Sequence, residues 1–517
     1  MVYRFSMIRG LAVLLLSAAA SPFGAAVAKV TPADVTQPTT PPPAETADSA
    51  PTADAPPVTG VAETGVPDAP ASSLPLDPRM EAYDQFRALY DTARYEEALP
   101  LAQRVVELSE TDSDRDYELP IAYNNLGATQ FKLNDFAAAE ASYRKSLEML
   151  EASQGISSRR LITPLAGLGS AHAALDQHAI AAEYFDRALA VSRRAEGLFN
   201  LEQLPLIEQA ASSRFAIGDF DGVEHERRYA LRILEQNYGY DDARTLPAAL
   251  KLAEFYESLQ EFHAARGLYL RVRDVAMQES GGYNVAAVRA MISICRTHRL
   301  QYTIDPESLD EDVPVRDPIT GQLAGKKYRA ARMPAQGADR AGLRSAEQAV
   351  EILRAAVDPP KELFAEALTE LADWYQVTSR PALALPLYAE ASTLYATGEF
   401  TGAGNPFVAP RMVYYRAPLS SKRSAGNVTN TVIIRETVFT FVVTESGGTE
   451  NIQVVSTDMA DSQLSQARRA LARALYSPRF VDGKPVATEG VQFTSEWHEL
   501  QLPASASSAA ANPASGS

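Results

Sequence analysis

The residue types that most often carry catalysis or bind metals are sparse in this chain, and their spacing suits neither role. Six histidines are scattered along it, and none has the H-E-x-x-H spacing that places two imidazoles on one helical face around zinc. A single cysteine, Cys295, excludes a zinc knuckle, a redox pair and an internal disulfide. No G-x-S-x-G nucleophile elbow occurs. We therefore expect no enzyme, no metal and no cofactor.

The nearest approach to a nucleotide motif is Gly321-x-x-x-Gly325-Lys326-Lys327. It is one residue shorter than a P-loop, has no Ser or Thr after the lysine and follows no predicted strand. The formal charge of −17 also argues against nucleic acid as the main partner, because phosphate binding needs a basic surface. Protein partners remain.

The dominant signal is a repeated pair of amphipathic helices. Between Ile121 and Leu150 the pattern predicts one helix to about Leu133, a break at Asn134-Asp135 and a second helix from Phe136. Small residues on the first helices recur in steps of 42, and so do those on the second helices. The two series are Gly127, Gly169, Ala211, Ala253 and Cys295, and Ala139, Ala181, Val223 and Ala265. A fixed period in two registers indicates a solenoid of helical hairpins, in which Cys295 is a buried packing residue.

Leu126-Gly127 with Ala139-x-x-x-Tyr143, and the matching Ala181-x-x-x-Phe185, resemble tetratricopeptide (TPR) repeats. The family period is about 34 residues, so the helices or the loops here are extended, as in kinesin-light-chain-like TPRs. The resemblance implies a right-handed α-solenoid of about seven hairpins across 79–397. It also implies that first helices line a concave, peptide-binding face. On that face we expect partner-binding residues Asn124, Phe131, Lys132, Glu208, Phe215, Glu254 and Glu257. The family's carboxylate clamp is not predicted, because only Asn124 and Lys132 suggest it.

The amino terminus has the features of a secretory signal peptide. Arg4 and Arg9 precede the apolar run Leu11–Leu16, and Ala26-Val27-Ala28 offers a cleavage site. An uncleaved membrane anchor is the alternative, although Pro22 and Gly24 interrupt the apolar segment. We expect an exported, periplasmic protein of a bacterial envelope that meets the membrane only if this segment stays uncleaved.

Two segments lack the periodicity of the hairpins. Residues 29–78 are rich in Pro, Ala and Thr and have no aromatic residue, which is typical of a disordered linker. Residues 301–340 are polar and contain four prolines, and they interrupt hairpin six as an insertion. Long loops of this kind are disordered or functional, and any enzymatic activity would have to reside in this one.

After Thr397 the pattern changes to that of a small α+β domain. Following a linker over 398–430, Val438–Val443 and Asn451–Ser456 alternate as a β-hairpin around Gly447-Gly448. A helix then runs from Asp461 to about Leu475, with three arginines on its outer face: Arg468, Arg469 and Arg473. Asp482-Gly483 is a tight turn, and a last strand runs from Val486 to Trp497. Residues 503–517 form a disordered tail.

The strand–strand–helix–strand order, with VFTFVVTESGGTENIQVV, LSQARRALARAL and Gly483-Lys-Pro-Val486, resembles the TonB C-terminal domain over about 431–502. In that family an exposed sheet edge pairs with an extended segment of an outer-membrane receptor, which is strand addition. The resemblance implies a binding edge at Val491, Phe493, Ser495 and Trp497.

These patterns predict a periplasmic scaffold that combines a TPR array with a strand-adding domain and binds protein partners, possible partners being outer-membrane or periplasmic proteins. The alternative is a divergent TonB-type energy transducer for outer-membrane transport. Such transducers keep a histidine in an N-terminal anchor, whereas the first histidine here is His172.

Overall fold

The computed structural model describes residues 77–111, 118–280, 283–303, 335–398, 404–418 and 431–501. The expected signal peptide (1–28), almost all of the linker (29–78) and the tail (503–517) lie outside these residues, as do 304–334 of the expected insertion. Contacts divide the chain into two compact units, one of residues 29–239 and one that contains residues 240–517.

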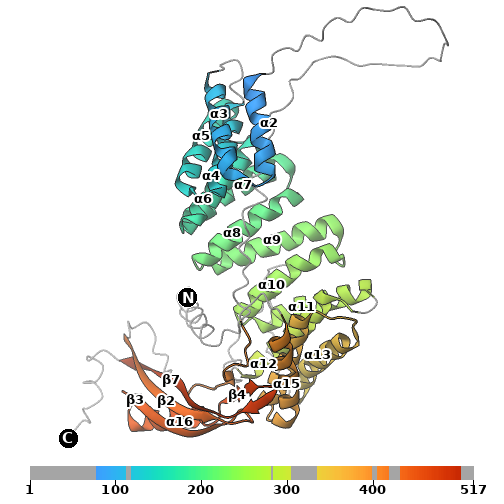
Figure 1. The fold of residues 1–517 in the computed structure, drawn as a ribbon, viewed down its shortest axis with the longest axis vertical. Helices are drawn as coiled ribbons and strands as arrows, with labels where there is room; N and C mark the ends of the chain where they lie inside the picture. The colour runs from blue at the N-terminus through green and yellow to red at the C-terminus, as the bar shows by residue number, and fades with distance from the viewer. Residues whose placement is uncertain are drawn as a thin grey trace, which may run out of the picture. The chain divides into compact units, whose positions relative to one another are not determined.

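Fourteen described helices, α2 to α15, form seven antiparallel hairpins (Figure 1). The predicted solenoid of helical hairpins is therefore confirmed. The first unit contains α2 (Pro78–Asp91) with α3 (Tyr95–Glu110), α4 (Leu119–Lys132) with α5 (Phe136–Gln154), α6 (Ile162–Ala174) with α7 (His178–Glu196), and α8 (Leu204–Ala216) with α9 (Phe220–Tyr238). The second unit contains α10 (Leu246–Ser258) with α11 (Phe262–Ser280), α12 (Val285–Thr303) with α13 (Ala335–Ala355), and α14 (Lys361–Val377) with α15 (Pro381–Thr397).

Small residues set the distance between the two helices of a hairpin. A Cβ added at Gly127 would lie 3.0 Å from the Tyr143 ring, and one added at Gly169 would lie 2.6 Å from the Phe185 ring. Cys295 is fully buried at the equivalent position of hairpin six, as its place in the repeat predicts. Burial raises the pKa of its thiol well above the usual value.

The 42-residue step has two visible causes. The second helices α5, α7, α9 and α11 each have 19 residues. Between successive hairpins the chain also makes one extra turn of 3-10 helix: η3 (Arg159–Leu161), η4 (Leu201–Gln203) and η5 (Ala243–Thr245). Ser158, Asn200 and Asp242 precede these turns, and each accepts a backbone N–H two residues on. Helices and loops are thus both longer than in a 34-residue repeat.

The α12–α13 hairpin contains the expected insertion between its helices. Both ends of the predicted range 301–340 are nevertheless helical, because α12 continues to Thr303 and α13 begins at Ala335. Ser345 on α13 donates a hydrogen bond to the Met291 carbonyl on α12 (3.0 Å), so the two helices pair despite the long connection.

The C-terminal region adds a three-stranded antiparallel sheet with the order β3-β2-β7. Its elements are β2 (Thr431–Val443), β3 (Thr449–Thr457), helix α16 (Asp461–Leu471) and β7 (Thr488–Gln501). They follow the predicted order strand, strand, helix, strand. The core between sheet and helix contains Phe439, Phe441 and Trp497 against Ala467 and Leu471.

Four short strands were not predicted, and they alter the expected boundaries. β1 (Arg411–Tyr414) lies in the expected linker 398–430 and pairs with β4 (Leu475–Ser477). The helix therefore ends at Leu471, since Leu475 belongs to a strand. β5 (Arg479–Val481) and β6 (Lys484–Val486) form a hairpin around Asp482-Gly483, where both φ angles are positive, as the tight turn requires.

Six hairpin turns place one residue in the left-handed region: Ala93, Asn134, Asp176, Gly218, Gln260 and Ser379. Gly218 (φ 75°) and Gln260 (φ 61°) occupy equivalent positions 42 residues apart. Only glycine adopts this conformation without strain.

We predict that Gln260→Gly stabilises its hairpin by about 0.5–1 kcal/mol and that Gly218→Ala destabilises its own by about 1 kcal/mol. Gln260 is exposed, so no packing is lost. Thermal unfolding followed by circular dichroism measures both effects, and shifts of the same sign in the two variants would contradict the backbone explanation.

Candidate partner-binding surfaces and the buried charge network

Two arginines on α12 connect three consecutive first helices. Arg296 Nε lies 2.7 Å from Glu257 Oε1 on α10, and its Nη1 lies 3.5 Å from Glu366 Oε1 on α14. Glu257 also accepts a hydrogen bond from the Tyr269 hydroxyl (2.8 Å). Arg299, three residues on and nearly one turn away, extends toward α14. These charged groups therefore form ion pairs between neighbouring helices.

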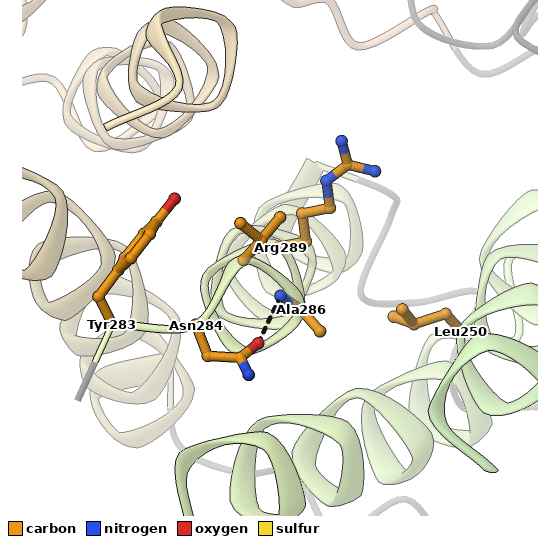
Figure 2. Close-up of a pocket in the computed structure, with 6 residues that line it drawn as sticks. Leu250, Tyr283, Asn284, Ala286 and Arg289 are labelled. Carbon is orange, nitrogen blue, oxygen red and sulfur yellow. Dashed lines mark hydrogen bonds between the residues drawn. The ribbon is translucent and has the colours of Figure 1, made fainter. Parts of the chain in front are cut away.

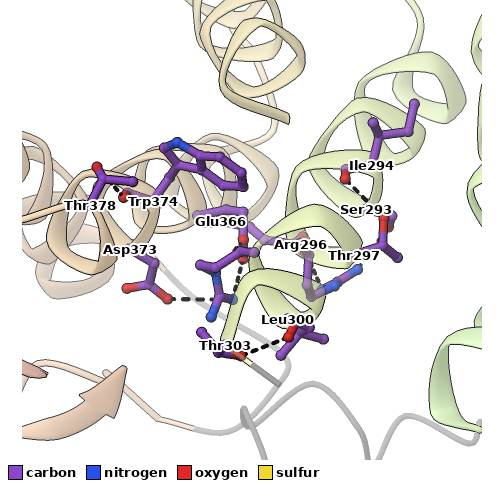
Figure 3. Close-up of polar contacts among 12 residues, drawn as sticks. Ser293, Ile294, Arg296, Thr297, Leu300, Thr303, Glu366, Asp373, Trp374 and Thr378 are labelled. Carbon is purple, nitrogen blue, oxygen red and sulfur yellow. Dashed lines mark hydrogen bonds and ion pairs between the residues drawn. The ribbon is translucent and has the colours of Figure 1, made fainter. Parts of the chain in front are cut away.

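Arg299 connects to a carboxylate that three groups share. Its Nε and Nη2 donate to the two oxygens of Glu370 (2.6 and 2.8 Å), and Nη2 lies 3.7 Å from Asp373 Oδ2. The other oxygen of Asp373 accepts from Arg411 Nη2 on β1 (2.5 Å) and from the Tyr388 hydroxyl on α15 (2.6 Å). Figure 3 shows Arg296 on α12 and the acidic side chains of Glu366 and Asp373 on α14. We call Arg296, Arg299, Glu257, Glu366, Glu370, Asp373 and Arg411 the charge network.

Burial and ion pairing act in opposite directions on Asp373. Burial alone would raise the pKa of its carboxyl, but Arg411 and Arg299 outweigh burial, so the pKa lies below its usual value. Burial, together with the negative charge of Asp373, raises the pKa of the Tyr388 phenol well above 10. Asp373 is thus ionised and Tyr388 is a hydrogen-bond donor at neutral pH.

Further polar and apolar contacts attach the C-terminal strands to the last hairpin. Gln376 Nε2 on α14 donates to the carbonyls of Ser446 (2.8 Å) and Tyr476 (3.1 Å). Phe407 and Phe480 pack into the apolar core that α14 and α15 form, and their rings cross nearly at right angles, 5.6 Å apart. Because β1, β4 and β5 all contact α14 or α15, the C-terminal strands are a packed part of this unit.

The residues predicted for the concave face differ widely in accessibility. Asn124 and Phe131 are 5% and 6% exposed, and Phe131 packs on the Phe136 ring at 5.2 Å. Lys132 is half-buried. Asn124 Oδ1 is buried and accepts no hydrogen bond from the described residues. The first two are therefore core residues of hairpin two.

The other predicted groove residues are Phe215 and three glutamates. Phe215 is 47% exposed, and its ring lies 5.8 Å from the Phe220 ring. Glu254 is exposed and Glu208 is half-buried. Glu257 is held by Arg296 and Tyr269 in the charge network. Glu257 is therefore engaged within the protein, whereas the side chains of Phe215 and Glu254 are exposed.

An open hollow lies between α10 and α12 and has a volume of about 580 Å³. Its lining combines Leu250 with Tyr283, Val285 and Arg289, and Asn284 caps the start of α12 by accepting the Ala286 N–H (2.8 Å). Figure 2 shows the Tyr283 ring and the Arg289 guanidinium on separate sides of the helix start, with Leu250 on the facing helix. The hollow can accept a side chain of a partner.

The predicted residues of β7 point into the protein. Ser495 and Trp497 are 2% and 7% exposed, and the Phe493 ring packs on Tyr415 at 4.7 Å. Tyr415 also shares a hydrogen bond with the Ser495 hydroxyl (3.1 Å). Val491 belongs to the same core. A partner strand would therefore meet the backbone of β7, and these side chains would hold that backbone in place from the inside.

The direction of the β7 backbone groups follows from the neighbouring strand β2. The N–H of Glu436 donates to Asp458 Oδ1 (2.5 Å), and its carbonyl accepts from the Asp458 N–H (3.1 Å). Glu436 thus faces the β3 side. Because successive residues of a strand point their backbone groups to opposite sides, Thr437 and Phe439 face β7.

Their register partners on β7 are Ser495 and Phe493, so these two residues hydrogen-bond to β2. Gln492 and Thr494, which alternate with them, direct their N–H and C=O groups to the outer side. Both side chains are exposed, and among the described strands none pairs with β7 on that side. β7 therefore presents an open edge.

The described ranges contain no cluster of three His, Cys, Asp or Glu side chains that could hold a metal ion. None of their helices is both long and apolar enough to cross a membrane.

Residues 87–152 and 165–200 each match a family model of the tetratricopeptide repeat, so the chain contains TPR repeats. No curated protein matches it. Among solved structures, a Podosopora anserina protein described as a kinesin light chain with nearly identical TPR-like repeats is 14% identical. That match covers 40% of this chain and 97% of the other, with a TM-score of 0.36.

Two further solved structures are similar at 14% identity. BtubC (BKLC) from P. vanneervenii matches over 65% of this chain and 98% of its own length, with a TM-score of 0.30. The TPR2AB domain of yeast Sti1, solved in complex with pHSP90, matches over 61% and 98%, with a TM-score of 0.20.

We predict that Asp373→Asn or Arg411→Met lowers the free energy of unfolding by about 3 kcal/mol, because each breaks the buried ion pair between these two residues. Both tryptophans, Trp374 and Trp497, lie in this unit and are buried, so denaturation followed by tryptophan emission reports on it. The Asp373→Asn deficit should shrink as the pH falls below about 4, since wild-type Asp373 then loses the stabilisation that its lowered pKa provides.

The matched control is Arg354→Met. Arg354 pairs with Glu390 at 2.5 Å, but both side chains are substantially exposed (51% and 39%). Its loss should cost less than about 1 kcal/mol. Equal losses in Arg411→Met and Arg354→Met would show that the network is not stabilising through buried charge.

Proposed function

We propose that this protein is an envelope scaffold that binds one protein through its TPR hairpins and a second through strand addition at β7. TPR repeats commonly form protein-binding surfaces, which supports the scaffold role. The observation that carries the second part is the open edge of β7, where Gln492 and Thr494 direct backbone groups outward. An extended segment could satisfy those groups with a ladder of its own.

The order of elements in the C-terminal domain supports the proposed likeness to TonB C-terminal domains. Two long strands, one helix and a last strand at the edge of the sheet follow the pattern that the sequence predicts. The side chains that face inward from β7 pack on Tyr415 and the core, so the edge is formed before a partner binds. Preorganisation of this kind reduces the entropy cost of binding.

For the solenoid, the proposal favours the hairpins outside the charge network. Arg296 is already paired with Glu257, and Arg299 with Glu370. Partner binding there would require breaking buried ion pairs, which is costly. Exposed Phe215 on α8, in the first unit, has no such constraint. We therefore assign the peptide-binding role to the first unit.

Strand addition predicts that Thr494→Pro blocks partner capture without unfolding the domain. Proline removes the N–H that faces the open side and is tolerated at a sheet edge. The measurement is photo-crosslinking in the native host from a benzoylphenylalanine placed at Gln492. We expect a protein adduct in the parent chain and at least tenfold less in Thr494→Pro.

Two controls accompany this experiment. Thr494→Val keeps the N–H and should retain the adduct. Phe493→Pro removes a donor to β2 and should instead destabilise the domain, which the emission of Trp497 would report. An adduct of undiminished yield in a folded Thr494→Pro protein would rule out pairing at this edge.

The proposed location in the periplasm rests on the amino terminus and is tested by the intact mass and membrane partition of the native protein. We expect a mass that begins at Lys29 and a soluble periplasmic fraction. A retained Met1 in the inner membrane would favour the energy-transducing alternative, with the C-terminal domain at the working end.

A further inference from the structure

Three arginines near the end of α16 form an exposed basic surface on a strongly acidic protein. Arg468, Arg469 and Arg473 are all exposed, whereas Ala467 and Leu471 of the same helix are buried in the core. The stretch 462–481 contains four arginines and no acidic residue, although the chain has a formal charge of −17. We call Arg468, Arg469 and Arg473 the α16 arginine cluster.

These arginines differ from most others in the described part of the chain because they form no ion pair there. Arg469 Nε donates only to the backbone carbonyl of Ser465 (3.2 Å). Exposed arginines elsewhere have a nearby acid: Arg104 pairs with Glu107 at 3.0 Å, and Arg94 pairs with Glu97 at 2.6 Å. The α16 cluster therefore has three guanidinium groups available to another molecule.

The helix itself explains only part of the pattern. Cations in the last turn of a helix complement its dipole by about 0.3–1 kcal/mol each, and Arg468 and Arg469 lie in that turn. Arg473 follows the end of the helix, so the dipole does not account for it. Nor does the dipole explain why acidic residues are absent from the surrounding stretch.

We propose that the α16 arginine cluster binds an acidic segment of a protein partner. Guanidinium groups present fixed pairs of N–H donors that match carboxylates in a bidentate manner. Exposed ion pairs add little affinity individually, but they speed association and select the partner by charge. The proposal does not depend on strand addition, because no backbone edge is involved.

An anionic membrane is the less favourable occupant. Each basic residue near an anionic surface contributes about 1 kcal/mol, so three contribute only about 3 kcal/mol, and the net charge of −17 opposes approach. The apolar residues of α16 are buried against the sheet and cannot insert into lipid. A short acidic peptide can bind the cluster without placing the rest of this acidic protein against an extended anionic surface.

The test uses the full chain and a fluorescein-labelled octaglutamate peptide, with binding followed by anisotropy at low ionic strength, where exposed charges are least screened. We expect the triple variant R468Q/R469Q/R473Q to bind about tenfold more weakly than the parent. The matched control R94Q/R104Q/R354Q changes the net charge equally but removes only arginines that already have acidic partners, and it should stay within about twofold of the parent.

Three outcomes would overturn the proposal. They are equal weakening in the triple variant and the control, no binding by the parent, and binding of the parent to phosphatidylglycerol vesicles without binding to the peptide. Thr494→Pro should leave peptide binding unchanged, so failure of this proposal is distinguishable from failure of strand addition. Unchanged Trp497 emission shows that the triple variant is folded.

Discussion

The Tyr240–Ser517 unit depends on one buried carboxylate, that of Asp373. Burying an ionised carboxyl costs free energy unless several hydrogen-bond donors or positive charges replace the water around it. Here Tyr388 on α15 and Arg411 on β1 donate hydrogen bonds, and Arg299 on α12 adds a positive charge 3.7 Å away. If any of the three elements detached, the buried Asp373 carboxylate would lose one of these partners. Apolar residues of similar volume in place of a buried ion pair often give equal or greater stability. The network therefore contributes more to fixing how these elements pack than to the net free energy of unfolding.

The C-terminal strands cover the end of the array of hairpins. A solenoid exposes the apolar face of its last repeat unless a cap covers that face. In this chain Phe407 and Phe480 cover α14 and α15, while Gln376 satisfies two carbonyls of the sheet region. Arg411 extends the alternation of acids and bases that runs from Glu257 through Arg296 to Glu366. The C-terminal strands thus take the place that a further first helix would occupy.

Much of this fold could be read from the sequence because its signals are local and repeated. The 42-residue step at Gly127, Gly169 and Cys295 identifies the helical hairpins, since each position must admit a neighbouring ring. Alternation between Val438 and Val443 likewise identifies a strand. The charge network could not be read in this way. Arg299 and Asp373 are far apart in sequence, and each resembles an ordinary surface charge until the hairpins are stacked. A spacing of three or four between acids on α14 and between bases on α12 was the only hint. The inward direction of Phe493 was likewise hidden, because a strand's pattern does not say which face is covered.

The connection within hairpin six affects how the chain folds. Thirty-one residues separate Thr303 from Ala335, whereas the other hairpins turn within a few residues. Loop-closure entropy grows with the logarithm of length, so bringing α13 back to α12 costs about 2 kcal/mol more than closing a three-residue turn. Folding of a repeat protein can begin at any repeat and spreads to its neighbours, and synthesis delivers the amino-terminal hairpins first. Propagation from the amino-terminal hairpins should therefore pause at α12 during synthesis. Arg296 can then already pair with Glu257 on α10, but Arg299 lacks its partner Glu370 until α14 has formed.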